Sequence, residues 1–337
     1  MERVLLEALG GQSRRNGPSV HPPMDLNKLD DLVLFLQSHA IEQSTKNNYS
    51  TGARDYVRFC TSHNLSLDPT PSTLSRYIAF TSRHKASGPK YLTGARHYLK
   101  DVYPHFDESR SHPLVQATIR GSKKVRADPV KRKPPLRTSH LQQFLELKTK
   151  SYNHLLFATL ISCCFYGCHR VGELTFPNQK SLRDWRKVIK RSTLKFEAGR
   201  AGYHLPYHKG DPFYQGTDIL FCSQQVADPV TLLKEYATVR DKLHGARPAL
   251  FILEDGNVPT RGWFDSMFFA VLSKEFGGHS GRAGGATFYA GLGLQEMIIM
   301  ALGRWSSSAW KIYIRDNPAV RAELELAAIR RHQSSSS

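Results

Sequence analysis

Four residues near the C-terminal end of the chain have types and spacings that suit chemistry on a phosphodiester. The stretch "HSGR" places His279 and Arg282 three residues apart, and Trp305 and Tyr313 follow, eight residues apart. Residues three apart on a helix share one face, so His279 and Arg282 can bind the same anion. A tyrosine hydroxyl is a nucleophile, a guanidinium binds two phosphate oxygens at once, and an indole N–H is a neutral donor.

Two earlier segments supply further groups of the same kind. In "GCHRVGEL", Arg170 follows an apolar segment, and Glu173 can hold its side chain in place. In "LPYHKGDPF", Lys209 stands where two strands are predicted to turn, and Lys195 on the earlier strand is the alternative. Strand cleavage without a metal needs a nucleophile, two guanidiniums for the charge that develops on the non-bridging oxygens, and an acid for the leaving oxygen. The sequence contains a candidate for each role.

The charge balance indicates a polyanionic partner. The chain has 337 residues, with 47 Lys and Arg against 29 Asp and Glu, for a net charge of +18. Such an excess favours nucleic acid or an anionic membrane surface. No apolar run is long enough to cross a bilayer and no signal peptide is visible, so we expect double-stranded DNA and no membrane. A merely solvated basic surface is the alternative.

The cysteines argue against a metal site. The five are odd in number and contain no CxxC pair, and Cys163, Cys164 and Cys168 lie in an apolar stretch where thiols act as small hydrophobes. Cys168 and His169 lack the rest of a ligand set. We therefore expect no metal, no other cofactor and a reducing compartment.

The N-terminal part of the chain is predicted to be helical. Residues 1–24 form a tail rich in Gly, Pro, Ser and Arg, and residues 25–122 form a helical domain. Apolar periodicity and Ser/Thr or Pro start signals predict helices over 24–40, 44–64, 70–84, 88–106 and 112–127. In the first, Leu29, Val33 and Leu36 form an apolar stripe.

A basic linker, residues 123–137, is predicted between two domains. From Gly121 to His140 the chain has seven basic residues, one acid and three prolines, a composition typical of a linker. It can be a solvated hinge, a segment lying along DNA phosphates, or both, and "KRKP" also resembles an import signal. The residues expected to bind DNA are Lys123, Lys124, Arg126, Lys131, Arg132, Lys133 and Arg137.

A mixed domain over residues 138–331 follows the linker, and residues 332–337 are a polar tail. Three short alternating segments, 191–199, 201–211 and 217–222, predict a small antiparallel sheet among helices. Gly291, Gly293 and Gly303 are predicted to end helices, which would let the chain fold His279 and Tyr313 into one pocket. The expected fold class is mostly α with a small antiparallel β-sheet in the second domain.

The ordered set Arg170, Lys209, His279, Arg282, Trp305 and Tyr313 resembles the catalytic pattern of the tyrosine recombinase, or phage-integrase, family. Glu173 matches an acidic position of that pattern. The stretches "GRWSS" and "HSGRAGGATFYAGLG" are similar to recombinases of eukaryotic Crypton and DIRS-like mobile elements. The resemblance spans residues 26–330 and includes a helical core-binding domain before the catalytic domain.

The resemblance implies a site-specific recombinase that integrates or excises a mobile element. Tyr313 would attack to give a 3′-phosphotyrosine, with Lys209 as the acid and no metal or ATP. It further implies a homo-tetramer on two duplexes, no small-molecule cofactor, and a nuclear location if the source is eukaryotic, or otherwise an intracellular one with DNA. The final helix could dock on a neighbouring copy or pack within its own chain.

Two other functions fit the same residues. One is a DNA-binding regulator captured from a mobile element, without strand-transfer activity. The other is a type IB topoisomerase, which shares much of the chemistry. The helical domain before the linker and the final helix favour the recombinase.

Overall fold

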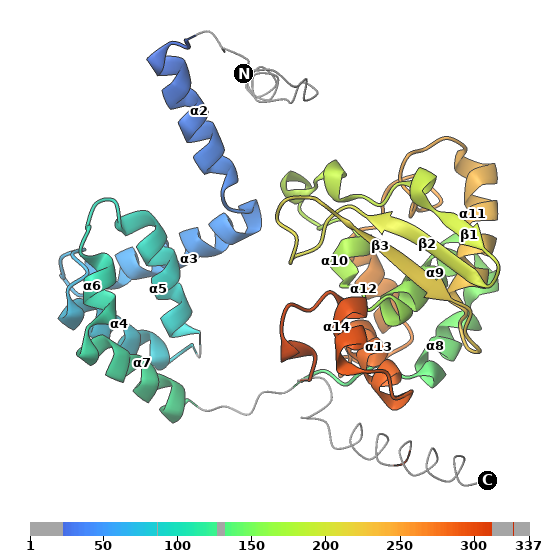
Figure 1. Ribbon diagram of the computed structural model, residues 1–337. Helices are drawn as coiled ribbons and strands as arrows, with labels where there is room; N and C mark the ends of the chain where they lie inside the picture. Colours follow the sequence, from blue (N-terminus) through green and yellow to red (C-terminus); the bar gives the residue numbers. More distant parts are fainter. Residues whose placement is uncertain (1–22, 86, 127–131, 312–325, 327–337) are drawn as a thin grey trace. The chain divides into compact units, whose positions relative to one another are not determined.

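The computed structural model describes residues 23–85, 87–126, 132–311 and Leu326, which belong to two compact units that divide at residues 130–131. The described part of the first unit is helical, and the second combines helices with one three-stranded antiparallel sheet (Figure 1). The fold class predicted from the sequence is confirmed.

Helices of the first unit pack around a core rich in aromatic side chains. They are α3 (Gln43–Ser62), α4 (Pro71–Ser82), α5 (Gly88–Leu99), α6 (Phe106–Ser111) and α7 (Pro113–Val125), and α2 (Leu26–His39) precedes them without contributing to this core. Helix α4 starts as its sequence predicts, because the Thr70 hydroxyl accepts the Thr73 amide and Pro71 occupies the first turn. Tyr56 and Tyr77 are fully buried in this core.

Helix α2 differs from the other helices of its unit. Leu29, Val33 and Leu36, which form the predicted apolar stripe, are 41%, 49% and 53% exposed, and Leu32 is the buried residue of the helix. The helix therefore forms where it was predicted, but the described residues of this unit do not cover its stripe.

The second unit is built around α9 (Tyr152–Tyr166), which is buried from Leu156 to its end. Around it lie α8 (Thr138–Leu145), α10 (Val171–Leu174), α11 (Pro229–His244), α12 (Arg261–Phe269), α13 (Ser280–Gly291) and α14 (Glu296–Gly303), and short 3₁₀ turns η1 (Lys148–Lys150), η2 (Lys180–Leu182), η3 (Trp185–Lys187), η4 (Arg191–Thr193) and η5 (Ser308–Lys311). Because α9 is apolar on all sides, it can serve as the centre of the core.

The sheet has the order β1-β2-β3 and corresponds to the three predicted segments. Its strands are β1 (Lys195–Glu197), β2 (Arg200–Leu205) and β3 (Thr217–Cys222). Residues alternate along β2, so Ala201, Tyr203 and Leu205 face the core while their neighbours are more exposed. The pairing of Leu205 with Thr217 leaves residues 206–216 as the loop between β2 and β3.

Glycines in "GRAGGAT" let α13 approach α9 closely. A Cβ added at Gly285 would overlap the Phe165 carbonyl oxygen and lie 2.8 Å from the Cys168 sulfur. Any side chain at this position would push α13 away from the end of α9. The close approach brings Arg282, one turn earlier on α13, to the residues that follow α9.

The structure also tests whether the described helices could cross a membrane. Among the residues that it describes, none of the helices is both long enough and apolar enough to span one.

Candidate active site

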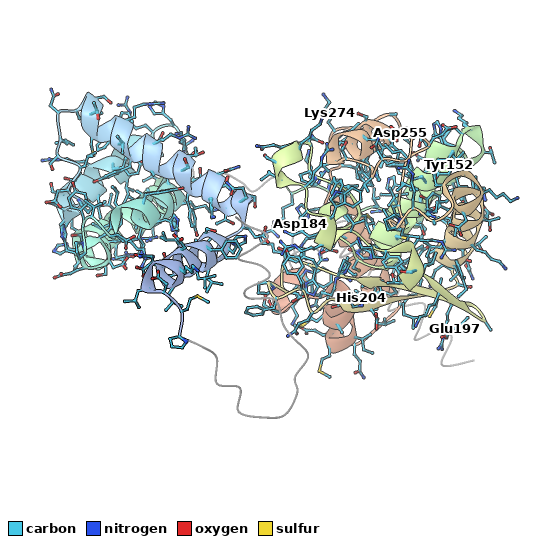
Figure 2. All side chains as sticks on the ribbon, turned by 90° about the horizontal axis from the view of Figure 1, so that it is seen from above. Tyr152, Asp184, Glu197, His204, Asp255 and Lys274 are labelled. Atoms are coloured by element: carbon cyan, nitrogen blue, oxygen red, sulfur yellow. The ribbon has the colours of Figure 1, made fainter. Side chains whose placement is uncertain are left out.

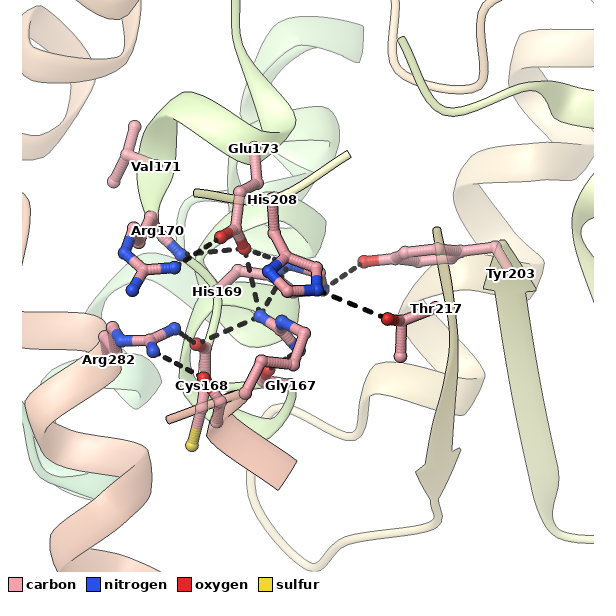
Figure 3. A network of polar contacts seen from close by, with 12 residues as sticks. Gly167, Cys168, His169, Arg170, Val171, Glu173, Tyr203, His208, Thr217 and Arg282 are labelled. Atoms are coloured by element: carbon pink, nitrogen blue, oxygen red, sulfur yellow. Dashed lines mark hydrogen bonds and ion pairs between the residues drawn. The ribbon is translucent and has the colours of Figure 1, made fainter. Parts of the chain in front are cut away.

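The site begins where α9 ends and α10 starts. Cys168 has a left-handed backbone, with φ of +47°, and its carbonyl oxygen accepts hydrogen bonds from both Arg282 and Arg304. Arg170 is the N-cap residue of α10, directly before the first helical residue. The turn therefore places Arg170 next to the Arg282 guanidinium, and Figure 3 shows the two side chains together.

Glu173 is the buried anion around which the cations gather. One carboxylate oxygen accepts a hydrogen bond from the Arg170 guanidinium at 3.0 Å. The other accepts from the Arg170 amide at 3.1 Å and the Arg304 guanidinium at 2.9 Å, and contacts His169 Nδ1 at 3.0 Å. Burial alone would raise the pKa of Glu173, but the hydrogen bond from His169 and the charges of Arg304 and Arg282 outweigh it and hold the pKa well below its usual range. Glu173 is ionised at neutral pH and orients Arg170.

His169 connects this anion to the sheet. Its ring is fully buried, with Nδ1 against Glu173 and Nε2 2.9 Å from the Tyr203 hydroxyl on β2 (Figure 3). Burial, reinforced by the charge of Arg304, lowers the pKa of His169 to about 4. The ring is therefore neutral, donating from Nδ1 to Glu173 and accepting at Nε2 from Tyr203.

Arg282 is held from two sides. One guanidinium nitrogen donates to the Cys168 carbonyl and the other to the Gly303 carbonyl, which ties α13 to the end of α9 and to the end of α14. Burial, together with the charge of Arg170, lowers the pKa of Arg282 to about 10, so the group stays charged at neutral pH. Arg170 and Arg282 thus lie together, and two guanidiniums in this arrangement could bind one anion between them.

Trp305 lies directly against this pair. The Arg282 guanidinium carbon is 4.2 Å from the centre of the indole ring, a cation–π contact. A Cβ added at Gly303 would collide with the same ring, so glycine is required there. Gly303 is the last residue of α14 as predicted, but the left-handed residue after it is Arg304, with φ of +56°.

His279 stands at the start of α13, where its position before the first turn brings it near Arg282. Partial burial lowers the pKa of His279, and the charges of Arg261, Arg282, Arg170 and Lys209 lower it further. The ring is neutral at pH 7 because its ordinary pKa is already about 6.5. A phosphate at this position would meet a neutral imidazole beside two guanidiniums.

Lys209 is exposed in the loop between β2 and β3. The Asp211 amide donates to the His208 carbonyl at 2.8 Å, which closes a tight turn with Lys209 at its second position. The Lys209 charge acts on His279, whereas Lys195 lies on β1 and lines a hollow of about 480 Å³ with Glu197 and other residues of the sheet. The assignment of the acid to Lys209 stays a prediction, and its position beside His279 favours it.

The residues predicted to bind DNA from the linker have different surroundings. The helix predicted over 112–127 continues through Val125, so Lys123 and Lys124 belong to the last turn of α7. Both side chains are exposed there. Arg126 is partly buried and donates to the Ser82 carbonyl at 2.8 Å within the first unit.

The second half of the linker lies against the start of α13. The Leu136 amide donates to the Ser280 carbonyl at 2.9 Å, next to His279, and the Lys133 ammonium donates to the Lys274 carbonyl. Arg132 and Arg137 are exposed. This half of the linker is therefore fixed beside the candidate site, and its exposed cations stay predicted phosphate contacts.

Tyr313 and Lys131 lie outside the described residues, so their predicted roles rest on the sequence. The structure brings together Arg170, Glu173, Arg282 and Trp305, with His279 and the Lys209 loop beside them. Three members of the network were missed as functional residues: His169, Tyr203 and Arg304. The sequence signal for Arg304 was its place directly after Gly303, where the chain must turn.

Arg304 is expected to stabilise the second unit through Glu173. Arg304→Met removes one cation from a buried carboxylate and should lower the free energy of unfolding by about 1–3 kcal/mol. All four tryptophans lie after residue 131, so urea unfolding followed by tryptophan fluorescence reports on this unit. In the double variant with Glu173→Gln the two losses should not add, because the carboxylate that needs the cation is gone. Additive losses would show that Arg304 stabilises the unit only through its hydrogen bonds to the backbone carbonyls of Gly167, Cys168 and Leu302.

Comparison with solved structures identifies the fold. XerH site-specific recombinase bound to a palindromic difH substrate superposes with a TM-score of 0.57 at 16% identity, covering 85% of this chain and 79% of that chain. Tn1549 transposon integrase bound to transposon right end DNA gives 0.56 at 13%, covering 90% and 100%. A lambda integrase dimer on a COC′ core site gives 0.52 at 16%, covering 87% and 96%. No protein-family model and no curated protein matches the chain. The chain has the fold of site-specific tyrosine recombinases.

Proposed function

We propose that this protein is a site-specific DNA recombinase that cuts and rejoins strands through a covalent phosphotyrosine. One observation carries the proposal: Arg170 and Arg282, from elements far apart in the sequence, lie together (Figure 3), and His279 and the Lys209 loop are beside them. The fold supports it, because the three solved structures compared above are recombinases or integrases, and all three are bound to DNA.

The proposed reaction has two steps, and the second is the chemical reverse of the first on a different strand. The Tyr313 hydroxyl oxygen attacks phosphorus, the bond from phosphorus to the 5′-oxygen breaks, and neutral His279 accepts the phenolic proton. The Lys209 ammonium donates a proton to the departing 5′-oxygen. Arg170 and Arg282 stabilise the charge on the non-bridging oxygens. The free 5′-hydroxyl of a partner strand then attacks phosphorus and gives its proton to Lys209. The bond from phosphorus to the Tyr313 oxygen breaks, and His279 returns the proton to that oxygen.

Covalent trapping tests the proposal. The protein would be incubated with a labelled duplex whose nick lets the short 5′-hydroxyl fragment diffuse away after cleavage. A DNA adduct that survives denaturation and is removed by protease is the expected result. A regulator would bind the duplex and give no adduct. A topoisomerase would give the adduct and relax supercoils, but would not exchange strands between two marked duplexes.

The finer features are also proposals. The stretches that resemble Crypton and DIRS-like enzymes support a mobile-element recombinase acting in the nucleus. Exchange between two duplexes requires four active sites, which supports a homo-tetramer on DNA. Lambda integrase has been solved as a tetramer on a Holliday junction with the same fold, at a TM-score of 0.52.

Arg282→Lys is expected to lower the cleavage rate by about a hundredfold, the scale for losing one such transition-state donor. Lysine keeps the charge but cannot donate to Cys168, Gly303 and a phosphate in one plane. Single-turnover cleavage of the nicked duplex measures the effect, and Arg170→Lys should behave alike. Arg200→Lys, at the exposed start of β2, is the matched control and should cleave normally. A folded Arg282→Lys variant with a near-normal rate would remove this residue from the site.

Neutralising Lys131, Arg132 and Lys133 should weaken binding to all DNA sequences alike. If all three contact phosphates, the slope of log affinity against log salt should fall by roughly three units. Fluorescence anisotropy over a range of salt concentrations measures the slope. A variant that neutralises Lys150, Lys234 and Lys242, all exposed, removes the same number of charges and is the control. An unchanged slope would mean that these three charges do not contact phosphates, and are either solvated or part of an import signal.

A further inference from the structure

The loop between β2 and β3 exposes an aromatic side chain. Phe213 is 81% exposed, although it lies only two residues after Asp211, which is buried. Figure 1 shows this loop extending beyond the sheet on the side where α10 lies. A single exposed phenylalanine is common on protein surfaces, so its meaning depends on how the loop is held and what surrounds it.

Asp211 fixes the backbone of the loop. Its carboxylate accepts the Gly216 amide at 2.7 Å and the Phe213 amide at 3.3 Å, and its own amide closes the turn onto His208. These hydrogen bonds join the start, the middle and the end of the loop. Hydrogen bonds therefore fix the backbone at Phe213, while its side chain is exposed to solvent.

The two tyrosines of the loop are held against η3. Their rings, Tyr207 and Tyr214, lie 4.9 Å apart. The Lys187 ammonium is 4.1 Å from the Tyr207 ring centre, and the Arg186 guanidinium is 4.7 Å from that of Tyr214.

An acidic anchor completes this attachment. The Tyr214 hydroxyl donates a hydrogen bond to Asp184 at 3.0 Å. Figure 2 shows that Asp184 lies far from Glu197, so the loop is attached at a distance from the hairpin end of β1. Both tyrosines thus pack onto a basic segment, while the phenylalanine next to Tyr214 remains exposed.

The same loop faces the candidate active site. The His208 ring of this loop lies 3.4 Å from the Thr217 hydroxyl, and Figure 3 shows it beside Glu173. Burial lowers the pKa of His208, and the charges of Arg304, Glu173 and Arg170 also act on it, while the charge of Lys209 acts on His279. Phe213 follows Lys209 by four positions, so their backbones are at most about 14 Å apart. That distance is about four nucleotide steps at ~3.4 Å each. DNA whose cleaved phosphate contacts Lys209, as the proposed function requires, would therefore pass within reach of Phe213.

We propose that Phe213 stacks on a DNA base within about four nucleotides of the cleaved phosphate, and that Lys187 and Lys209 bind the neighbouring phosphates. An aromatic ring among cations is the combination that binds an unstacked base and its backbone together. The proposal rests on the proposed function for the position of the DNA. It adds a base contact that favours sites where a base unstacks easily.

Fluorescence of 2-aminopurine, which rises on unstacking from DNA and falls on stacking against a ring, tests the contact. The base would be placed singly at each of four positions on either side of the cut, with Tyr313→Phe as the background so that binding is measured without cleavage. Phe213→Ala should abolish a protein-dependent change at one or two positions, and Phe213→Trp should retain it. Phe196→Ala, on the exposed strand β1, is the matched control.

Affinity gives a second measurement. Phe213→Ala should weaken binding by roughly fivefold to 150-fold, the range for losing one stacked base. Replacing the base at the responsive position by an abasic site should weaken binding by the protein with Phe213 and leave binding by the Phe213→Ala variant unchanged. Identical fluorescence and affinity with and without the Phe213→Ala substitution would overturn the proposal, as would failure to bind DNA.

The outcomes separate this inference from the proposed function. If the chain with Tyr313 forms no covalent adduct while the Phe213-dependent fluorescence persists, the base contact stands and strand transfer fails. If the adduct forms and Phe213→Ala changes neither binding nor fluorescence, strand transfer stands and the base contact fails. Phe213 is exposed, so its replacement should leave the circular dichroism spectrum unchanged.

Discussion

Tyr313→Phe should bind DNA as tightly as the parent protein and form no covalent adduct. The substitution removes one hydroxyl oxygen, and the ring that remains cannot form a bond to phosphorus. Denaturing electrophoresis of the nicked-duplex reaction measures the adduct, and anisotropy measures binding in parallel. Tyr289→Phe is the control, because that hydroxyl donates to the Tyr166 carbonyl at 2.8 Å and has no proposed role in attack.

The assignment of Tyr313 rests on the sequence and is open to a direct contradiction. If the Phe variant is trapped as well as the parent protein, another residue attacks. Protease digestion of the adduct and identification of the peptide bound to DNA would then show which residue it is.

Lys209→Ala is expected to cleave ordinary DNA about a hundredfold to ten-thousandfold more slowly, the range for losing a positioned general acid. The alkoxide that leaves from the 5′-carbon needs a proton. A 5′-thiolate does not need one, because thiols are far stronger acids than alcohols. A substrate with a bridging 5′-sulfur at the cut should therefore restore much of the rate to the Lys209 variant.

Two comparisons make the sulfur experiment specific. Arg282→Lys should stay slow with the sulfur substrate, because its defect lies at the non-bridging oxygens. Lys195→Ala should cleave both substrates normally, since Lys195 lies on β1 and lines a hollow on the sheet. Should sulfur rescue Lys195→Ala and leave Lys209→Ala inactive, the acid lies on β1.

Local patterns in the sequence were sufficient for many elements of the fold, although the helix predicted over 88–106 ends at Leu99 and α6 was not predicted. The Ser/Thr start signal at residues 44–45 did not cap its helix, because α3 already begins at Gln43. The three alternating segments became β1, β2 and β3, and the Thr-Pro signal at residues 70–71 preceded a helix that formed. These features depend on residues within a few positions of each other, through capping, turn closure and side-chain alternation. The contact of Glu173 with Arg170 was foreseen for the same reason, because the two residues lie one helical turn apart.

Burial of the α2 stripe could not be predicted in this way. Leu29, Val33 and Leu36 have helical spacing, and spacing predicts a helix with an apolar face. Whether another element covers that face depends on the rest of the fold, and in the described part of the first unit these residues remain exposed.

The network around Glu173 was decided by tertiary structure alone. His169, Tyr203 and Arg304 come from the end of α9, from β2 and from the end of α14. Taken singly, each could be an ordinary buried or surface residue. They act together because the ionised carboxylate is buried, and a buried charge must be matched by cations and donors wherever the fold brings them.

The sequence by itself determined which chemical groups the protein has, their order, and the helices and strands that hold them. It did not determine which of those groups meet. Gly285 lets α13 reach the end of α9, and the left-handed turn at Cys168 directs one carbonyl to Arg282 and Arg304. Both depend on packing between segments more than a hundred residues apart. That packing, and not the spacing of motifs, brings Arg170 and Arg282 together (Figure 3).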